Sequence, residues 1–141
     1  MNYEKKKNKL ERYRPLLDKF NILKNELEEF EKRSLNMATR ITVGELDKIR
    51  TVGGKNDLNK VSAFAERDEL YKLKLKEMQK TFDEMKEILV AINGIENIDF
   101  QNAVYCYFVQ DMSYAEIAFQ CRISEDTARW RNTEGIKRIK F

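Results

Sequence analysis

Small polar and basic side chains gather near the C-terminus at spacings that suit contact with a nucleic acid. Small polar groups at the start of a helix can reach base edges, and basic groups that follow can bind phosphates. The candidate contact residues are Ser124, Glu125, Asp126, Thr127, Arg129, Trp130, Arg131, Thr133, Lys137 and Arg138. Their order predicts the recognition helix of a module that binds double-stranded DNA.

Two short helices joined by a tight turn would present these groups. Ser113 and Glu116 have the spacing of a capping box, which predicts that a helix follows over residues 114–120. Residues 121–123 then predict the turn, and Ser124 predicts the N-cap of the second helix. The pattern is that of a helix-turn-helix, preceded by a further short helix.

The interior of this motif is predicted from three apolar positions. Ile117, Ile123 and Ala128 are spaced to face inward together, and Ala128 is small enough for two helices to cross closely beside it. Trp130 could stack on a base or wedge between bases, but packing against the preceding short helix is the commoner role of a lone Trp. A helical bundle whose basic face is only solvated is the alternative interpretation.

Charge is concentrated at the two ends of the chain. Residues 1–14 hold six basic and two acidic residues, and residues 127–141 hold five basic and one acidic, within a net charge of +3. We call the first group the N-terminal basic cluster, and it consists of Lys5, Lys6, Lys7, Lys9, Arg12 and Arg14. We expect it to form a frayed or separate helical arm that either reaches a phosphate backbone or only solubilises the chain.

The first half of the chain predicts two long helices. Apolar residues recur every three or four positions from Tyr13 to Met37, and Pro15 suits a first helical turn, so a helix is expected to begin near Arg14. Residues 36–56 predict a connecting loop, with a short helix around residues 44–50. Its Gly-Gly-Lys does not have the spacing of a Walker phosphate loop.

A second, longer helix should begin at an Asp57 N-cap and end at Asn93-Gly94. Its apolar stripe is close to a heptad seam, so we expect it to pack on the first helix as an antiparallel hairpin and to mediate self-association. The predicted seam consists of Val61, Phe64, Tyr71, Leu75, Met78, Phe82, Met85, Leu89 and Ile92.

Several function classes are excluded or disfavoured by composition. The chain has no His, so neither a Ser-His-Asp triad nor a Cys2His2 zinc site is available, and we expect no enzyme activity, metal or cofactor. Cys106 and Cys121 lie among apolar neighbours and are expected to be reduced core thiols. No apolar run approaches the length of a membrane span, so we expect a soluble, cytoplasmic protein without a membrane partner.

The segments 114–118 and 122–128 resemble the helix-turn-helix of sigma-70 region 4, as used by phage transcriptional regulators. In outline the whole chain is similar to the ArpU-like and RinA-like activators of phage late genes in Gram-positive bacteria. The resemblance implies binding at a promoter-proximal site and activation of phage packaging and morphogenesis genes. Arg122 stands where the family has Gly, which predicts a left-handed residue at a cost of about 1 kcal/mol. The positions that match the family's DNA-facing stretch are Ser124, Glu125, Asp126, Thr127 and Arg129.

The acidic pair Glu125 and Asp126 departs from this pattern, because it repels phosphate unless it accepts from a cytosine amino group. Asp126 and Trp130 also stand where the family often has basic residues. A protein is therefore an alternative binding partner for the motif.

We expect an all-α protein in which residues 1–94 form a helical hairpin or coiled coil for oligomerisation and residues 95–141 form the DNA-binding domain. The predicted function is a phage or prophage transcriptional regulator, acting as a homodimer or higher oligomer in the bacterial cytoplasm. A DNA-packaging adaptor of the small-terminase type is an alternative, as is a protein that binds RNA polymerase or another host factor. Rings of eight or more subunits would favour the adaptor, and dimers the regulator.

Overall fold

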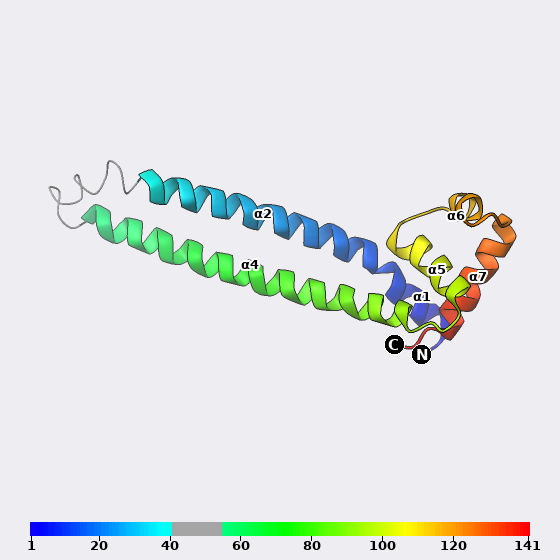
Figure 1. Ribbon diagram of the computed structural model, residues 1–141. Coiled ribbons are helices and arrows are strands. Elements are labelled where there is room, and N and C mark those ends of the chain that lie inside the picture. The colour runs from blue at the N-terminus through cyan, green and yellow to red at the C-terminus, as the bar shows by residue number, and fades with distance from the viewer. Residues whose placement is uncertain (41–54) are drawn as a thin grey trace. The chain divides into compact units, whose positions relative to one another are not determined.

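The computed structural model describes the backbone of residues 1–40 and 55–141 and the side chains of residues 1–33 and 66–141. Every element in these ranges is a helix, so the predicted all-α class is confirmed (Figure 1). The helices are α1 (Tyr3–Glu11), α2 (Tyr13–Arg40), α4 (Lys55–Asn93), α5 (Ile98–Val104), the π-helical turn η2 (Tyr105–Val109), α6 (Tyr114–Cys121) and α7 (Glu125–Arg138).

The helices form two compact units. The hairpin unit comprises residues 20–80, and the terminal unit comprises residues 1–19 together with 81–141. Because α2 and α4 are long, each contributes residues to both units. The unit that contains the helix-turn-helix is thus larger than the predicted domain of residues 95–141, since it includes α1 and the last turns of α4.

In the hairpin unit, α2 and α4 lie side by side and run antiparallel, as predicted (Figure 1). The Tyr71 hydroxyl donates a hydrogen bond to Glu31 Oε1 at 2.6 Å, and the Tyr71 ring stacks on Phe30 with centroids 5.5 Å apart. Further along, Lys74 of α4 forms an ion pair with Glu26 of α2. The hydrogen bond to Glu31 raises the pKa of Tyr71, because it holds the hydroxyl in its protonated form.

The bounds of the two long helices differ from the prediction. α2 continues to Arg40, through residues 36–40 that were assigned to the loop, because this stretch holds no Gly or Pro to end the helix. α4 already begins at Lys55, so Asp57 lies inside the helix and is not its N-cap. The predicted short helix at residues 44–50 and the Gly-Gly pair lie outside the described residues.

The predicted heptad seam on α4 is partly wrong. Met85 and Ile92 are buried as expected, but Leu75 is 38% exposed and Phe82 is 46% exposed. Val61 and Phe64 of the predicted seam lie outside the residues whose side chains are described. The buried stripe instead runs through Thr81, Met85, Ile88 and Ile92. From Tyr71 the predicted seam moves four residues to Leu75 and then alternates steps of three and four. In the structure, the residue after Tyr71 that contacts α2 is Lys74, which is only three positions further on. This choice of phase rotates Leu75 and Phe82 toward solvent.

The break between α1 and α2 follows from Pro15. A proline has no amide hydrogen, so it cannot donate to the carbonyl of Glu11, and α1 ends at that residue. The helical path resumes at once, with the Leu16 amide bonded to the Arg12 carbonyl at 3.1 Å. The prediction of a separate helix before Pro15 is confirmed, and Asn2 caps its start by accepting from the Lys5 amide.

The terminal unit is built around α7, which packs against α5, α6 and α1. α4 ends at Asn93, as predicted, and Asn97 caps α5 by accepting from the amides of Asp99 and Phe100. The fully buried side chains of this unit, all less than 2% exposed, include Leu10, Ile92, Val104, Ile117, Ile136 and Ile139.

Gly135 marks the point of closest approach between α7 and α5. A Cβ atom at this position would lie 2.4 Å from Val104 Cγ2 and 3.0 Å from the Phe100 carbonyl oxygen. Because both neighbours are buried, neither can move aside cheaply. Gly135 is therefore needed for α7 to lie this close to α5.

Candidate nucleic-acid interface

The helix-turn-helix is formed by α6, a turn centred on Arg122, and α7. The Ser113 hydroxyl accepts from the Glu116 amide at 3.2 Å and also bonds the Glu116 carboxylate at 3.2 Å, close to the predicted capping box. Arg122 has φ 57° and ψ 47°, which is the left-handed conformation expected at the turn. Ser124 caps α7 by accepting from the Thr127 amide at 3.1 Å. These local predictions are confirmed.

The interior of the motif is also as predicted. Ile117 and Ala128 are buried in one cluster with Cys106 of η2, and Ile123 packs against it. Ala128 has no exposed surface, so a larger side chain there would separate α7 from α6. This cluster holds the start of α7 in place.

The candidate contact residues fall into two groups by exposure. Thr127, Arg131 and Thr133 are half-buried. The exposed residues are Ser124, Glu125, Asp126, Arg129, Trp130, Lys137 and Arg138. The exposed group carries acidic side chains at the start of α7 and basic side chains toward its end.

Arg129 is the basic side chain nearest the start of α7. Its Nη1 lies 3.5 Å from Asp126 Oδ1, and its guanidinium lies 5.2 Å from the centroid of the Tyr114 ring. The carboxylate thus offsets part of the charge of Arg129, while the ring limits its rotation. A guanidinium held in this way can form a paired contact with a guanine edge if Asp126 releases it.

Three further candidate residues contact α5. The Trp130 ring meets the Phe100 ring edge-on, with centroids 5.4 Å apart, although 56% of Trp130 stays exposed. The Arg138 guanidinium lies 4.7 Å from the same Phe100 ring. Arg131 was expected to face outward, but its side chain is only 24% exposed and lies 3.8 Å from Asp99 Oδ1. The expected packing of Trp130 on the preceding short helix is confirmed.

Intramolecular hydrogen bonds occupy the two threonines. The Thr133 hydroxyl donates to the Arg129 carbonyl at 2.9 Å, and the hydroxyls of Thr127 and Ser124 lie 2.7 Å apart. Each hydroxyl oxygen can still accept a further bond. Toward the end of α7, Glu134 lies 3.4 Å from Lys137 and 4.0 Å from Arg138, so one carboxylate is shared by two cations.

The N-terminal basic cluster is not a free arm, which corrects the expectation from sequence. Lys6 Nζ donates to the Lys137 carbonyl at 2.8 Å, and Arg14 Nη1 donates to the Val109 carbonyl at 3.1 Å. Lys9 and Arg12 pair with Glu87 and Glu84 at 2.6 and 3.5 Å. The physical reason is Leu10, whose burial anchors α1 to the terminal unit.

Sequence reasoning also missed a polar pair inside the motif. Asn132 is 2% exposed, and its Nδ2 donates to the Tyr114 hydroxyl at 2.9 Å, which links α7 to α6. Burial raises the pKa of Tyr114 above its ordinary value. The spacing of Ala128, Asn132, Gly135 and Ile136 on one face of α7 was a signal that Asn132 faces inward.

The two cysteines differ from each other. Cys106 is buried, as expected, and this burial raises the pKa of its thiol. Cys121 is exposed, so the expectation of a second core thiol is wrong. It is the last residue of α6, and the interior beside it is filled by Ile117 and Ala118. Among the residues with described side chains, no three Cys, Asp or Glu gather as a metal site would require.

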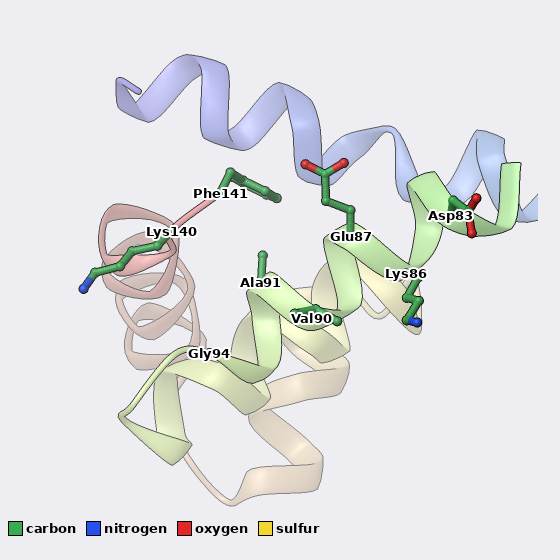
Figure 2. Close-up of a pocket in the computed structure, with 8 residues that line it drawn as sticks. All are labelled: Asp83, Lys86, Glu87, Val90, Ala91, Gly94, Lys140 and Phe141. Atoms are coloured by element: carbon green, nitrogen blue, oxygen red, sulfur yellow. The ribbon is translucent and has the colours of Figure 1, made fainter. Parts of the chain in front are cut away.

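A hollow of about 440 Å³ lies between the last turns of α4 and residues 140–141 (Figure 2). Val90, Ala91 and Phe141 supply its apolar surface, while Lys140 points away from it. Lys9 lies 4.6 Å from the Phe141 ring and also pairs with Glu87. This hollow therefore belongs to the packing of α1 against α4 and residue 141.

Comparisons of the chain with protein-family models, with curated proteins and with solved structures find no match. In the described part of the chain, no helix is both long enough and apolar enough to cross a membrane.

Proposed function

We propose that the chain binds double-stranded DNA through α7 and acts as a transcriptional regulator of phage or prophage genes. The observation that carries the proposal is the packing of α1 against α7 within one unit. It brings the N-terminal basic cluster, far away in sequence, beside the basic end of the predicted recognition helix. Counterion release from such a combined surface would supply affinity for any duplex.

The start of α7 would supply the sequence preference. Arg129, Trp130 and the carboxylates of Glu125 and Asp126 are exposed there, next to the capped end of the helix. A carboxylate can accept from the amino group of cytosine, and an arginine can bind guanine. This end of α7 would therefore enter the major groove, while the basic end and α1 contact phosphates.

The assignment to transcription depends on the resemblance of residues 114–128 to the helix-turn-helix of phage late-gene activators. A bacterial RNA polymerase would then be a second partner. We also propose that the protein acts as a homodimer, which would let two copies of α7 read a two-fold site. The hairpin unit supports this, because Leu70 and Leu73 of α4 are 48% and 61% exposed.

The acidic start of α7 favours a second candidate function, in which the motif binds a protein. Glu125 and Asp126 both repel phosphate, and Asp126 already offsets Arg129. In that case α7 would contact a basic surface of the partner, and the chain would have no preferred duplex sequence.

One experiment tests the proposal and separates the two candidates. The full chain is used to select duplexes from a random library, and binding of the selected and scrambled duplexes is measured by fluorescence anisotropy at fixed salt. We expect a consensus site that binds on the order of 10³-fold more tightly than the scrambled duplex. Equal binding of both duplexes, or no enrichment of any sequence, would refute the proposal of a sequence-specific regulator.

A further inference from the structure

The outer face of α6 exposes an aromatic side chain that no element of the terminal unit covers. Phe119 is 90% exposed, the largest value among the exposed large apolar residues described. Ala115 precedes it by four residues and lies on the same side of the helix. Ile117 and Ala118 are buried on the opposite side. α6 is thus apolar on two faces, of which only one is used to hold α7.

The surface around Phe119 is hollowed. A hollow of about 580 Å³ is lined by Met112, Ala115, Glu116, Phe119 and Gln120. A second hollow of about 400 Å³ adjoins it, because Met112 and Glu116 line both. We call the two hollows together the groove; it runs from the outer face of α6 to the junction of α1 and α2, where Glu11 and Arg14 lie.

The rim of this groove is acidic, although the chain as a whole is basic. Glu11, Asp111 and Glu116 are among the residues that line it. The only cation among its lining residues is Arg14, whose guanidinium donates to the Val109 carbonyl at 3.1 Å. A phosphate backbone would be repelled here, so the groove is unsuited to DNA.

We propose that this groove docks a helical, basic segment of a partner protein. An apolar side chain of that segment packs on Phe119 and Met112, while its Lys or Arg side chains pair with Glu11, Asp111 and Glu116. Helix-in-groove binding of this kind combines an apolar anchor with complementary charge at the rim. The groove is centred on α6 and reaches α1 only at its last residue, Glu11, whereas the proposed DNA contacts are made by α7 and by the lysines of α1.

A second copy of the chain is a poorer fit to the groove. The basic segments of the terminal unit, α1 and the end of α7, already bury their apolar residues Leu10 and Ile136 in that unit. Neither can offer an apolar anchor to another molecule without leaving that unit. The hairpin unit also has lysines beside the exposed Leu70 and Leu73, but these leucines are assigned above to the proposed dimer contact between hairpin units. The groove is therefore assigned to a different protein, and a second copy is one of the outcomes that the test separates.

The test uses the full chain labelled with ¹⁵N and a synthetic amphipathic helix made of Leu and Lys. We expect the amide shifts that change on titration to cluster at residues 111–120 and at Glu11. Phe119→Ser should weaken binding at least about tenfold, as removal of a central aromatic anchor does. Val90→Ser is the matched control, because Val90 is also exposed (60%) but lies outside the groove. Thermal unfolding of each variant checks that the fold is kept.

Three results would overturn the proposal. A matched helix of Leu and Glu that binds as tightly would show that the acidic rim plays no part. Shift changes at residues 111–120 on concentrating the protein alone would show that a second copy occupies the groove. The same changes on adding duplex DNA would show that α6 belongs to the nucleic-acid interface.

Discussion

The ammonium of Lys6 donates to the carbonyl of Lys137 at 2.8 Å and so joins α1 to the last turn of α7. The last carbonyls of a helix lack intrahelical donors and carry partial negative charge, so a lysine at this position is favourable. The bond connects two residues that are 131 positions apart. Whatever α7 binds through its basic end, α1 lies next to it.

This arrangement predicts that lysines of α1 contribute to the salt dependence of DNA binding. Replacing Lys5 and Lys7 together by Gln should lower the slope of log Kd against log salt by up to roughly 0.9 for each phosphate that the variant no longer neutralises. The preferred sequence should not change. Salt titrations of a selected duplex measure the slope, and Lys24→Gln with Lys32→Gln, on α2 of the hairpin unit, is the matched control. Superimposable slopes for wild type and the α1 variant would mean that α1 does not contact DNA.

Leu10 should be essential for docking α1. Leu10→Ala removes a side chain with no exposed surface and should lower the free energy of unfolding by about 2–5 kcal/mol. Ile22→Ala is the control, because Ile22 is 58% exposed, and it should change the stability by less than about 0.5 kcal/mol. Urea denaturation followed by circular dichroism compares them. Similar midpoints for the two variants would contradict the burial of α1.

Arg129 and Lys137 should affect DNA binding differently, because they lie at opposite ends of α7. Arg129→Ala should weaken a selected site by ~1–3 kcal/mol and relax its sequence preference, because the variant can no longer bind a base edge. Lys137→Ala should weaken selected and scrambled duplexes to a similar extent, because binding to a phosphate carries no sequence information. Anisotropy titrations of both duplexes measure this. If Arg129→Ala also affects both equally, Arg129 does not read bases.

Exposed leucines of the hairpin unit should mediate self-association. Replacing Leu70 and Leu73 by Glu places charges on the exposed side of α4, so an oligomer formed there should dissociate. Light scattering at micromolar concentration should give a multiple of 16.8 kDa for the wild type and 16.8 kDa for the variant. Lys72→Glu introduces a carboxylate nearby, in place of an ammonium that pairs with Asp68, without removing either leucine, and should leave the mass unchanged. A wild-type monomer would refute the proposal of a dimer, and a ring of eight or more subunits would favour the packaging adaptor.

The features that sequence predicted are those set by neighbouring residues. The cap formed by Ser113, the left-handed Arg122, the cap formed by Ser124 and the small Ala128 all depend on spacing within a short segment. The hairpin of α2 and α4 was predictable for a related reason, because a regular apolar stripe needs a partner helix. In each case local chemistry agreed with the final fold.

The features that sequence missed depend on contacts between distant segments. α1 has only one fully buried residue, Leu10, and its many lysines are equally typical of a free terminus. The outward placement expected of Arg131 failed because Asp99 of α5 lies beside it. Sequence could not decide either which residues of α4 face α2. Leu75 and its neighbour Lys74 were both possible contact residues, and the ion pair with Glu26 of α2 favours Lys74.

Tyr114, whose buried hydroxyl accepts from Asn132, should stabilise the helix-turn-helix in a pH-dependent way. Tyr114→Phe removes the acceptor of Asn132 Nδ2, and Asn132 Oδ1 has no hydrogen-bond partner of its own, so the buried amide would lose its bond. We expect a decrease of about 1–3 kcal/mol in the free energy of unfolding near neutral pH. Tyr105→Phe is the control, because Tyr105 is 37% exposed, and it should have little effect.

The pH dependence of this decrease follows from the raised pKa of Tyr114. Burial is its main cause, and it favours the neutral hydroxyl in the folded state, so the folded pKa lies above the ordinary value of 10.0. A group with a raised folded pKa contributes its full stabilisation below the unfolded pKa and loses it as pH rises through the folded pKa. The stability difference between wild type and Tyr114→Phe should therefore be constant up to about pH 9 and shrink above about pH 10.

Urea denaturation across this pH range measures the difference in stability. Subtracting the value for the variant cancels the contribution of Tyr13, whose pKa is also raised by burial. A difference that stays constant or grows above about pH 10 would show that Tyr114 is not held in its neutral form by the fold.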